Sequence, residues 1–388
     1  MTASPRVAVS AGFLAFGVAG GTVIPRLPDL KDHLHLSDGQ IGLALLFFAF
    51  GAMVGAVGSR FVLARGARLW VRAGVVGLCV ATVLPAVAAN LATFVVAFAL
   101  IGLCSGFIDA LLNAQGAELE RVAARPLING FHGFWSLGAL IGSLVAGAVA
   151  AAGVAPLPHF AVAAVLIAAA SAPVLAALPD TRSGAERTPP PGAARFWLTG
   201  AVIAVAAITF AGIIVEGGTS DWAAIYLREL GHASPGVAAA GFSALSMAMM
   251  LVRFRADVLT AHTSPVVVIR IGSITAALGV ALAIAFPALP TAIAGFVLVG
   301  AGCAVQLPLA FAAAANLGRS GTPLAIVMAS AYGGAIVGPP LIGGIAEHMG
   351  LRVAMAVPLL ASMTVLALSG SLGGAPVREG AKSLPAGR

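Results

Sequence analysis

Two acidic residues stand inside otherwise apolar stretches of the chain, Asp109 and Glu216. The other 12 of the 14 acidic residues lie near the ends of such stretches, in segments with other polar residues. An ionised carboxylate in hydrocarbon costs roughly 2.5–3.5 kcal/mol even on a lenient scale, so these two should face a cavity or a partner. Since burial makes a carboxyl group easier to protonate, both are predicted to bind a coupling proton. For Glu216 the alternative, a cap on nearby backbone amides, stays open.

Polar side chains accompany the two acids. Asn113 shares a helix face with Asp109, because residues four apart lie one above the other. Six side chains are predicted to contact a substrate: Asn113, Gln115, His132, Trp135, Gln306 and Tyr332. The alternatives are hydrogen bonds that join helices and, for Trp and Tyr, anchoring at the membrane surface.

Signatures of other chemistry are absent from the sequence. It has no GxxxxGK[ST] phosphate loop, no HExxH and no GxSxG motif. Cys79, Cys104 and Cys303 lie in apolar runs without metal-ligand spacing. We therefore expect no enzyme activity, no cofactor and no bound metal.

The composition requires lipid as the surrounding solvent. Of the 388 residues, 60% are hydrophobic and 9% charged. A span takes about 20 apolar residues, so the chain has room for about twelve. The net charge of +7 comes mostly from single Arg residues between apolar runs, which is typical of loops near anionic lipid. We expect a lipid bilayer as a partner and no nucleic acid.

The apolar runs predict an all-α membrane protein with twelve transmembrane helices in two six-helix bundles. Four parts are expected: a half over 1–178, a cytoplasmic linker over 179–195, a half over 196–373 and a polar cytoplasmic tail over 374–388. The predicted runs are Val7–Pro25, Ser37–Gly58, Ala73–Ala89, Leu91–Ala117, Leu127–Ala152, Phe160–Leu178, Phe196–Thr219, Pro235–Val252, Val266–Phe286, Thr291–Leu317, Leu324–Ala346 and Val353–Leu372.

The positive charges indicate an orientation. With a cytoplasmic N-terminus, 17 of the 21 Lys and Arg residues, Arg253 among them, fall on the cytoplasmic side. The remaining four are Arg26, Lys31, Arg228 and Arg352. This bias predicts both termini in the cytoplasm and a multi-pass protein of the cell inner membrane.

The two halves resemble each other at a shift of about 196 to 199 residues. Ser37-Asp38-Gly39 and Ser234-Pro235-Gly236 each have the composition of a helix start. The glycines 138, 142 and 147 correspond to 334, 338 and 343. Such repeats are typical of transporters with a site between two halves, and these glycines are expected to let helix backbones approach closely.

Four segments carry a resemblance to a known family: DALLNAQGAELE from Asp109, RPLINGFHGFWSLGALIGSLVAG from Arg125, EGGTSDWAAIYL from Glu216 and GAIVGPPLIGG from Gly334. With them, the whole chain resembles the major facilitator superfamily, in particular the branch related to the fucose:proton symporter. The resemblance implies secondary transport by alternating access, in which a small solute crosses the membrane through a monomer.

The family's loop after the second helix carries glycines, basic residues and an acid. Here the acidic position is Ser59, and the second copy of the loop has Asp257. By resemblance, four residues are predicted to gate the cytoplasmic side: Arg60, Arg65, Arg68 and Asp257. The alternative is that the arginines bind lipid headgroups.

Three functions remain open. Proton-coupled transport of a small polar, sugar-like solute is favoured by Asp109 with Asn113 and by the resemblance. Proton-driven efflux of an amphipathic drug or metabolite is favoured by the apolar composition. A membrane sensor without transport activity is expected to have an appended soluble domain, for which this chain has no room.

Overall fold

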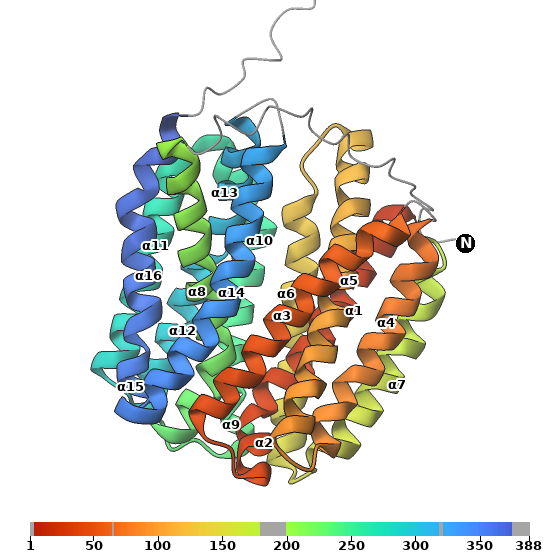
Figure 1. Cartoon of the computed structure of the whole chain (residues 1–388), viewed down its shortest axis with the longest axis vertical. Helices are drawn as coiled ribbons and strands as arrows, with labels where there is room; N and C mark the ends of the chain where they lie inside the picture. Colours follow the sequence, from red (N-terminus) through yellow and green to blue (C-terminus); the bar gives the residue numbers. More distant parts are fainter. Residues whose placement is uncertain (1–3, 64–65, 179–198, 318–320, 375–388) are drawn as a thin grey trace, which may run out of the picture.

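The protein is described by a computed structural model, which covers residues 4–63, 66–178, 199–317 and 321–374. These residues form a bundle of helices without a strand, and 12 helical segments are long and apolar enough to cross a membrane (Figure 1). The predicted fold class and number of spans are confirmed.

Several spans consist of two or three consecutive helices. In chain order the twelve spans are α1 Pro5–Val23 with η1 Ile24–Arg26 and α2 Leu27–Leu34; α3 Asp38–Leu63; α4 Ala67–Val83 with η2 Leu84–Val87; α5 Leu91–Ala123; α6 Ile128–Ala151; α7 Pro156–Leu175; α8 Gly200–Glu229; α9 Pro235–Ala238 with α10 Ala240–His262; α11 Pro265–Ala285; α12 Leu289–Cys303 with α13 Gln306–Asn316; α14 Thr322–Met349; and α15 Leu351–Ala354 with α16 Ala356–Leu368 and η4 Ser369–Gly374.

Local sequence explains where the helices begin. Asn90 and Thr93 form a capping box at the start of α5. Ser37 and Gln40 exchange side-chain bonds with each other's backbone N–H at the start of α3, as the predicted helix start requires. In the second half, α9 begins at Pro235 directly after Ser234, again as predicted, although the Ser234 side chain makes no cap bond.

The helices pack in two halves with matching partners, α1–α7 in the N-terminal half and α8–α16 in the C-terminal half. In the first half α1 packs on α6, and α3 on α5; in the second, α8 packs on α14, and α10 on α12. Two matching pairs join the halves, α3 with α14 and α6 with α10. In Figure 1 the halves lie side by side, with α3 and α14 crossing in front.

Glycines allow the closest helix contacts, as their spacing predicts. A Cβ atom on Gly138 would lie 2.2 Å from the carbonyl oxygen of Leu14, and one on Gly21 would lie 2.2 Å from that of Ala139. The backbones of α1 and α6 therefore touch. Between the halves, a Cβ on Gly236 would lie 2.8 Å from the carbonyl oxygen of Gly147.

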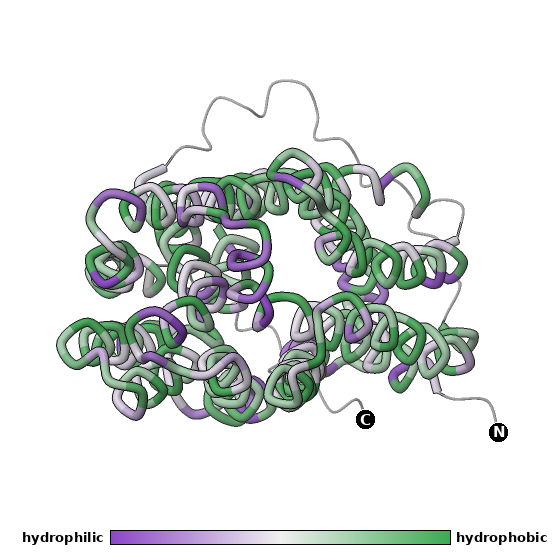
Figure 2. The backbone as a smooth tube through the Cα atoms, turned by 90° about the horizontal axis from the view of Figure 1, so that it is seen from below, coloured by the Kyte–Doolittle hydropathy of each residue, from purple (hydrophilic) through white to green (hydrophobic). Residues whose placement is uncertain are grey.

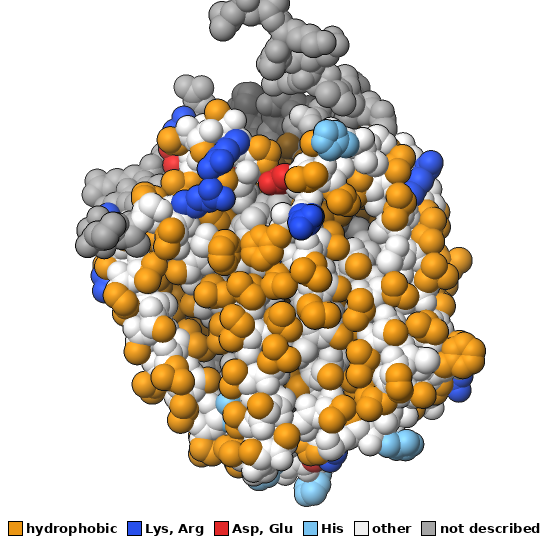
Figure 3. All heavy atoms as spheres, turned by 180° about the vertical axis from the view of Figure 1, so that it is seen from behind, with side chains coloured by type: hydrophobic (Ala, Val, Ile, Leu, Met, Phe, Trp, Pro, Cys, Tyr) orange, Lys and Arg blue, Asp and Glu red, His pale blue; other side chains and the backbone are white. Residues whose placement is uncertain are grey.

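The surface matches a lipid environment. Seen along the bundle, the helices are mostly hydrophobic (Figure 2). One whole face carries hydrophobic side chains over its middle, whereas Lys, Arg, Asp, Glu and His side chains gather near the two ends (Figure 3). We call the end with α2, α9 and α15 the outer end, following the orientation that the charge bias predicts, and the opposite end the inner end.

Several helices extend past their predicted limits, among them α8, which ends at Glu229 although the seventh run was expected to end at Thr219. The eighth span was expected to end at Val252, but α10 continues to His262; α3 and α5 also run five to six residues further than predicted. The predicted linker 179–195 lies outside the described residues, as does the tail beyond residue 374.

Candidate substrate and proton site

Asp109 lies near the middle of α5 and heads a chain of polar side chains. Asn113, one turn further, donates from Nδ2 to Asp109 Oδ1 over 2.9 Å. His132 on α6 places Nε2 3.2 Å from Asn113 Oδ1 and packs its ring 5.1 Å from that of Phe13. The predicted group of Asp109, Asn113 and His132 is therefore brought together by two neighbouring helices.

Glu216 lies near the middle of α8 and is paired with a cation that the charge analysis assigned to the cytoplasmic edge. Arg253 Nη2 lies 2.9 Å from Glu216 Oε1, and the Arg253 side chain is only 6% exposed. The assignment of Arg253 to a loop was wrong, because α10 continues past it and carries it into the bundle. Glu216 also does not cap a loop, because α8 is helical through Gly217 and Gly218.

A break in the tenth span supplies Arg253 with another acceptor. Pro308 has no N–H, and its ring excludes the usual helical bond to the carbonyl of residue i−4. That residue is Ala304, which lies between α12 and α13, and its free carbonyl oxygen accepts a bond of 3.2 Å from Arg253 Nε.

The same arginine bridges the two halves. Arg253 Nη1 donates to Ser136 Oγ on α6 over 2.8 Å, and Ser136 Oγ in turn donates to the His132 carbonyl over 3.1 Å. A path of hydrogen-bonded residues thus runs from Asp109 through Asn113, His132, Ser136 and Arg253 to Glu216. In this path His132 contacts Asn113 through its ring and Ser136 through its backbone carbonyl. The path joins the two acids that the sequence singled out.

Trp135 lies beside this path. The Arg253 guanidinium carbon is 5.9 Å from the centre of the Trp135 ring, within the range of a cation–π contact. The rings of Phe16 and Trp135 meet edge to face at 6.0 Å. Trp135 Nε1 and Glu216 Oε2 are buried without a hydrogen-bond partner, so a donor and an acceptor remain available near Arg253.

The other three residues predicted to contact a substrate, Gln115, Gln306 and Tyr332, are not part of this path. Gln115 is completely buried, on a face of α5 away from the Asp109 group. Gln306 is 1% exposed and donates to the Gly302 carbonyl over 3.1 Å, while its Oε1 has no partner. Tyr332 on α14 is half-buried and belongs to the C-terminal half.

Ion pairs between the halves gather at the outer end. Lys31 on α2 pairs with Asp38 over 2.6 Å and also with Glu229 at the end of α8. Arg228 approaches Asp32 to 3.8 Å. On α14, the Glu347 carboxylate accepts from the Gly39 amide of α3 over 2.9 Å. These contacts tie the halves together where the packing of Gly147 and Gly236 also brings them close.

The predicted gating residues lie toward the inner end. Asp257 Oδ1 accepts from Asn129 Nδ2 over 2.8 Å, across the interface between the halves. Arg68 Nε donates to the Leu178 carbonyl over 2.6 Å, within its own half. Arg60 is exposed, and Arg65 lies outside the described residues. The gating role of these four residues stays a prediction.

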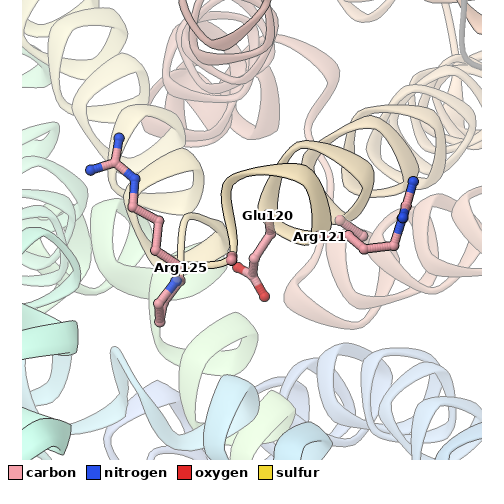
Figure 4. Close-up of a pocket in the computed structure, with 6 residues that line it drawn as sticks. Glu120, Arg121 and Arg125 are labelled. Atoms are coloured by element: carbon pink, nitrogen blue, oxygen red, sulfur yellow. The ribbon is translucent and has the colours of Figure 1, made fainter. Parts of the chain in front are cut away.

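An open pocket of about 390 Å³ lies where α5 ends and α6 begins. Glu120 and the extended side chains of Arg121 and Arg125 lie around it (Figure 4). Glu120 Oε2 accepts from the Leu127 and Ile128 amides, which caps α6. Glu120 follows Asp109 by eleven residues, about 16 Å along the helix, so this pocket is separate from the polar path.

The family model of the Major Facilitator Superfamily matches residues 9–316, and the chain belongs to this superfamily of membrane transporters. It is 33% identical over 355 residues to the uncharacterized transporter y4wD of Sinorhizobium fredii, covering 90% of this chain and 93% of that one. It is 27% identical to the membrane protein MosC of Rhizobium meliloti, covering 90% and 85%.

Solved transporters share the fold. A bacterial homologue of the human lysosomal transporter Spinster, inward-facing and occupied, superimposes with a TM-score of 0.71 at 14% identity, over 95% of this chain and 96% of that one. A fucose:proton symporter variant from E. coli gives 0.64 at 17% identity, over 95% and 98%. At these identities the likeness concerns the fold alone.

Proposed function

We propose that the protein is a proton-coupled secondary transporter that moves a small polar, sugar-like solute across the inner membrane as a monomer, with both termini in the cytoplasm. The observation that supports this proposal is the hydrogen-bonded path between Asp109 and Glu216 across the two halves. Asp109 and Glu216 are the proposed proton sites. Asn113, His132 and Trp135 are the proposed solute contacts.

The path suggests how protonation of an acid in one half changes the contacts with the other half. When Glu216 is ionised, it holds Arg253, whose other nitrogens bind Ser136 and the Ala304 carbonyl. A proton on Glu216 removes the charge that attracts Arg253, which weakens the arrangement joining α8, α10 and α6. A proton on Asp109 likewise changes what Asn113 and His132 can donate and accept. Either event alters contacts that alternating access must rearrange.

The experiment uses the purified protein in proteoliposomes with an imposed pH gradient. A panel of labelled sugars and polyols identifies a substrate by counterflow, and a panel of lipophilic cations tests the efflux alternative. With that substrate, Asp109→Asn is expected to abolish gradient-driven accumulation while exchange across the membrane continues, because exchange needs no net proton movement.

A matched control is Glu118→Gln on the same helix, whose partner is the exposed Arg121; it should accumulate substrate like the unaltered protein. Unchanged accumulation in Asp109→Asn would rule out Asp109 as a proton site. Extrusion of lipophilic cations without sugar counterflow would replace the proposed substrate class.

A further inference from the structure

A third carboxylate lies within the bundle, Asp221 on α8. It follows Glu216 by five residues and precedes Glu229 by eight, which places it about 7 Å outward of the Arg253 pair and about 12 Å inward of the outer ion pairs. The sequence had placed Asp221, like most of the acidic residues, near the end of an apolar stretch. Instead, Trp222 is fully buried, and Asp221 belongs to the membrane-spanning interior of α8.

The space beside Asp221 is internal. No residue of α8 from 204 to 228 is exposed, so neighbouring helices enclose this stretch. Asp221 is nevertheless partly accessible. Gly217 lies one turn away on the same helix face, and a Cβ atom added there would meet nothing within 4 Å. The carboxylate thus borders an open interior space rather than lipid.

Asp221 has no hydrogen bond or ion pair to any described residue, and the cations at that level are engaged elsewhere. Arg253 holds Glu216, and Arg228 contacts Asp32 and the Ala233 carbonyl. Lys31 pairs with Asp38 and Glu229, and Arg26 pairs with Asp29.

Other described titratable side chains on the elements that pack against α8 also form no hydrogen bond or ion pair with Asp221. These are His33 on α2, Arg255, Asp257 and His262 on α10, Cys303 on α12, and Tyr332, Glu347 and His348 on α14.

The repeat between the halves indicates that the fold does not require an acid here. Gly20-Gly21-Thr22 on α1 corresponds to Gly217-Gly218-Thr219 on α8, and a Cβ on Gly20 also meets nothing within 4 Å. The residue of α1 that corresponds to Asp221 is Ile24. The first half thus has an apolar side chain at the corresponding position, where its span passes from α1 into η1, so the repeat itself does not call for an acid.

We infer that Asp221 is a further proton-binding site, which exchanges its proton with the outer solution. An unpaired carboxylate that is enclosed by neighbouring helices and only partly accessible is costly when ionised, and a bound proton removes that cost. With the outer ion pairs closed, as here, the group is a neutral carboxylic acid. When these pairs separate, the outer solution reaches the group and it loses or gains a proton. This inference rests on the proposed proton coupling and adds a site on the outward side of Glu216.

The test follows carboxyl groups directly by infrared spectroscopy of the purified protein in lipid nanodiscs during a pH titration without substrate. Asp221→Asn should lose one band of a protonated carboxyl group that the unaltered protein shows. Asp221→Glu should keep such a band with a shifted pH midpoint, which excludes general misfolding as the cause of the loss. Glu216→Gln should keep the Asp221 band.

An unchanged set of protonated-carboxyl bands in Asp221→Asn would overturn the inference. Carboxylate bands that show Asp221 ionised throughout the titration would also overturn the inference. The outcome is independent of the transport test of Asp109→Asn. The Asp221 band can be absent although Asp109 couples transport to protons, and it can be present although Asp109 does not couple transport.

Discussion

Arg253 Nη1 and Ser136 Oγ lie 2.8 Å apart, although the two residues belong to different halves of the transporter. The same guanidinium binds Glu216 and the Ala304 carbonyl, so one side chain connects α6, α8, α10 and the break in the tenth span. In the proposed alternating-access cycle the halves move relative to each other, so this bond is expected to break or shift in each cycle. The predictions below start from this contact.

Replacing Arg253 alone should be more harmful than replacing it together with its partner. Arg253→Met leaves Glu216 charged and unpaired, and breaking a buried pair in this way costs about 3–5 kcal/mol. Arg253→Met combined with Glu216→Gln should recover most of that stability. Thermal unfolding in detergent, followed by the reactivity of the buried thiols of Cys79 and Cys303, measures both. Equal destabilisation by the single and double variants would argue against the pair.

Contact between α1 and α6 should be sensitive to a single added methyl group. Gly138→Ala places a Cβ 2.2 Å from the Leu14 carbonyl oxygen, and overpacking of this kind costs typically about 1–3 kcal/mol. Gly130→Ala on the same helix is the control, because nothing lies within 4 Å of its Cβ. The unfolding midpoint should fall for Gly138→Ala only. Equal midpoints for the two variants would show that the helices separate at little cost.

Lys31→Met should favour opening of the outer end, because it removes two ion pairs and leaves Asp38 and Glu229 without their cation. Only the pair with Glu229 joins the two halves. A pair of this kind contributes up to about 1 kcal/mol, so the open population should rise by up to about fivefold. The readout is the rate at which an impermeant maleimide labels Ser220→Cys in a protein without its three native cysteines. Arg121→Met, which breaks a pair within α5, should leave the rate unchanged. A rate in Lys31→Met no faster than in that control contradicts a closing role.

The proposed orientation predicts which loops are reached from outside. Ala152→Cys, in the exposed connection between α6 and α7, should react with an impermeant maleimide in intact cells. Arg125→Cys, in the connection between α5 and α6, should react only in inside-out vesicles. Both experiments use the background without native cysteines. The reverse pattern would invert the assignment of the outer and inner ends.

Hydropathy and residue spacing predicted much of the fold. Each span needs its own run of about 20 apolar residues, so the number of spans could be read from the chain. The helix start at Ser37 follows from local capping preferences, and the start at Pro235 follows from the preference for proline in the first helical turn; neither needs tertiary information. Asp109 with Asn113 is likewise a contact within one helix turn, set by helix geometry alone.

The partner of Glu216 could not be predicted in this way. A charge at the end of an apolar run is equally consistent with a loop and with a helix that continues, and only packing of α10 against α6, α8 and α12 decides between them. A signal was present: Val258 and Leu259 continue the apolar pattern beyond Arg253. The break before Gln306 depends on how Pro308 is accommodated among its neighbours, which the sequence does not specify.

The Ala304 carbonyl has a consequence for the evolution of this branch. A main-chain oxygen is not altered by replacing the side chain that it belongs to, so position 304 can vary without loss of the contact to Arg253. The residue that makes this oxygen available is Pro308, four positions later. Among relatives, the contact should therefore be visible as co-inheritance of Arg253 and Pro308, with variation tolerated at Ala304 between them.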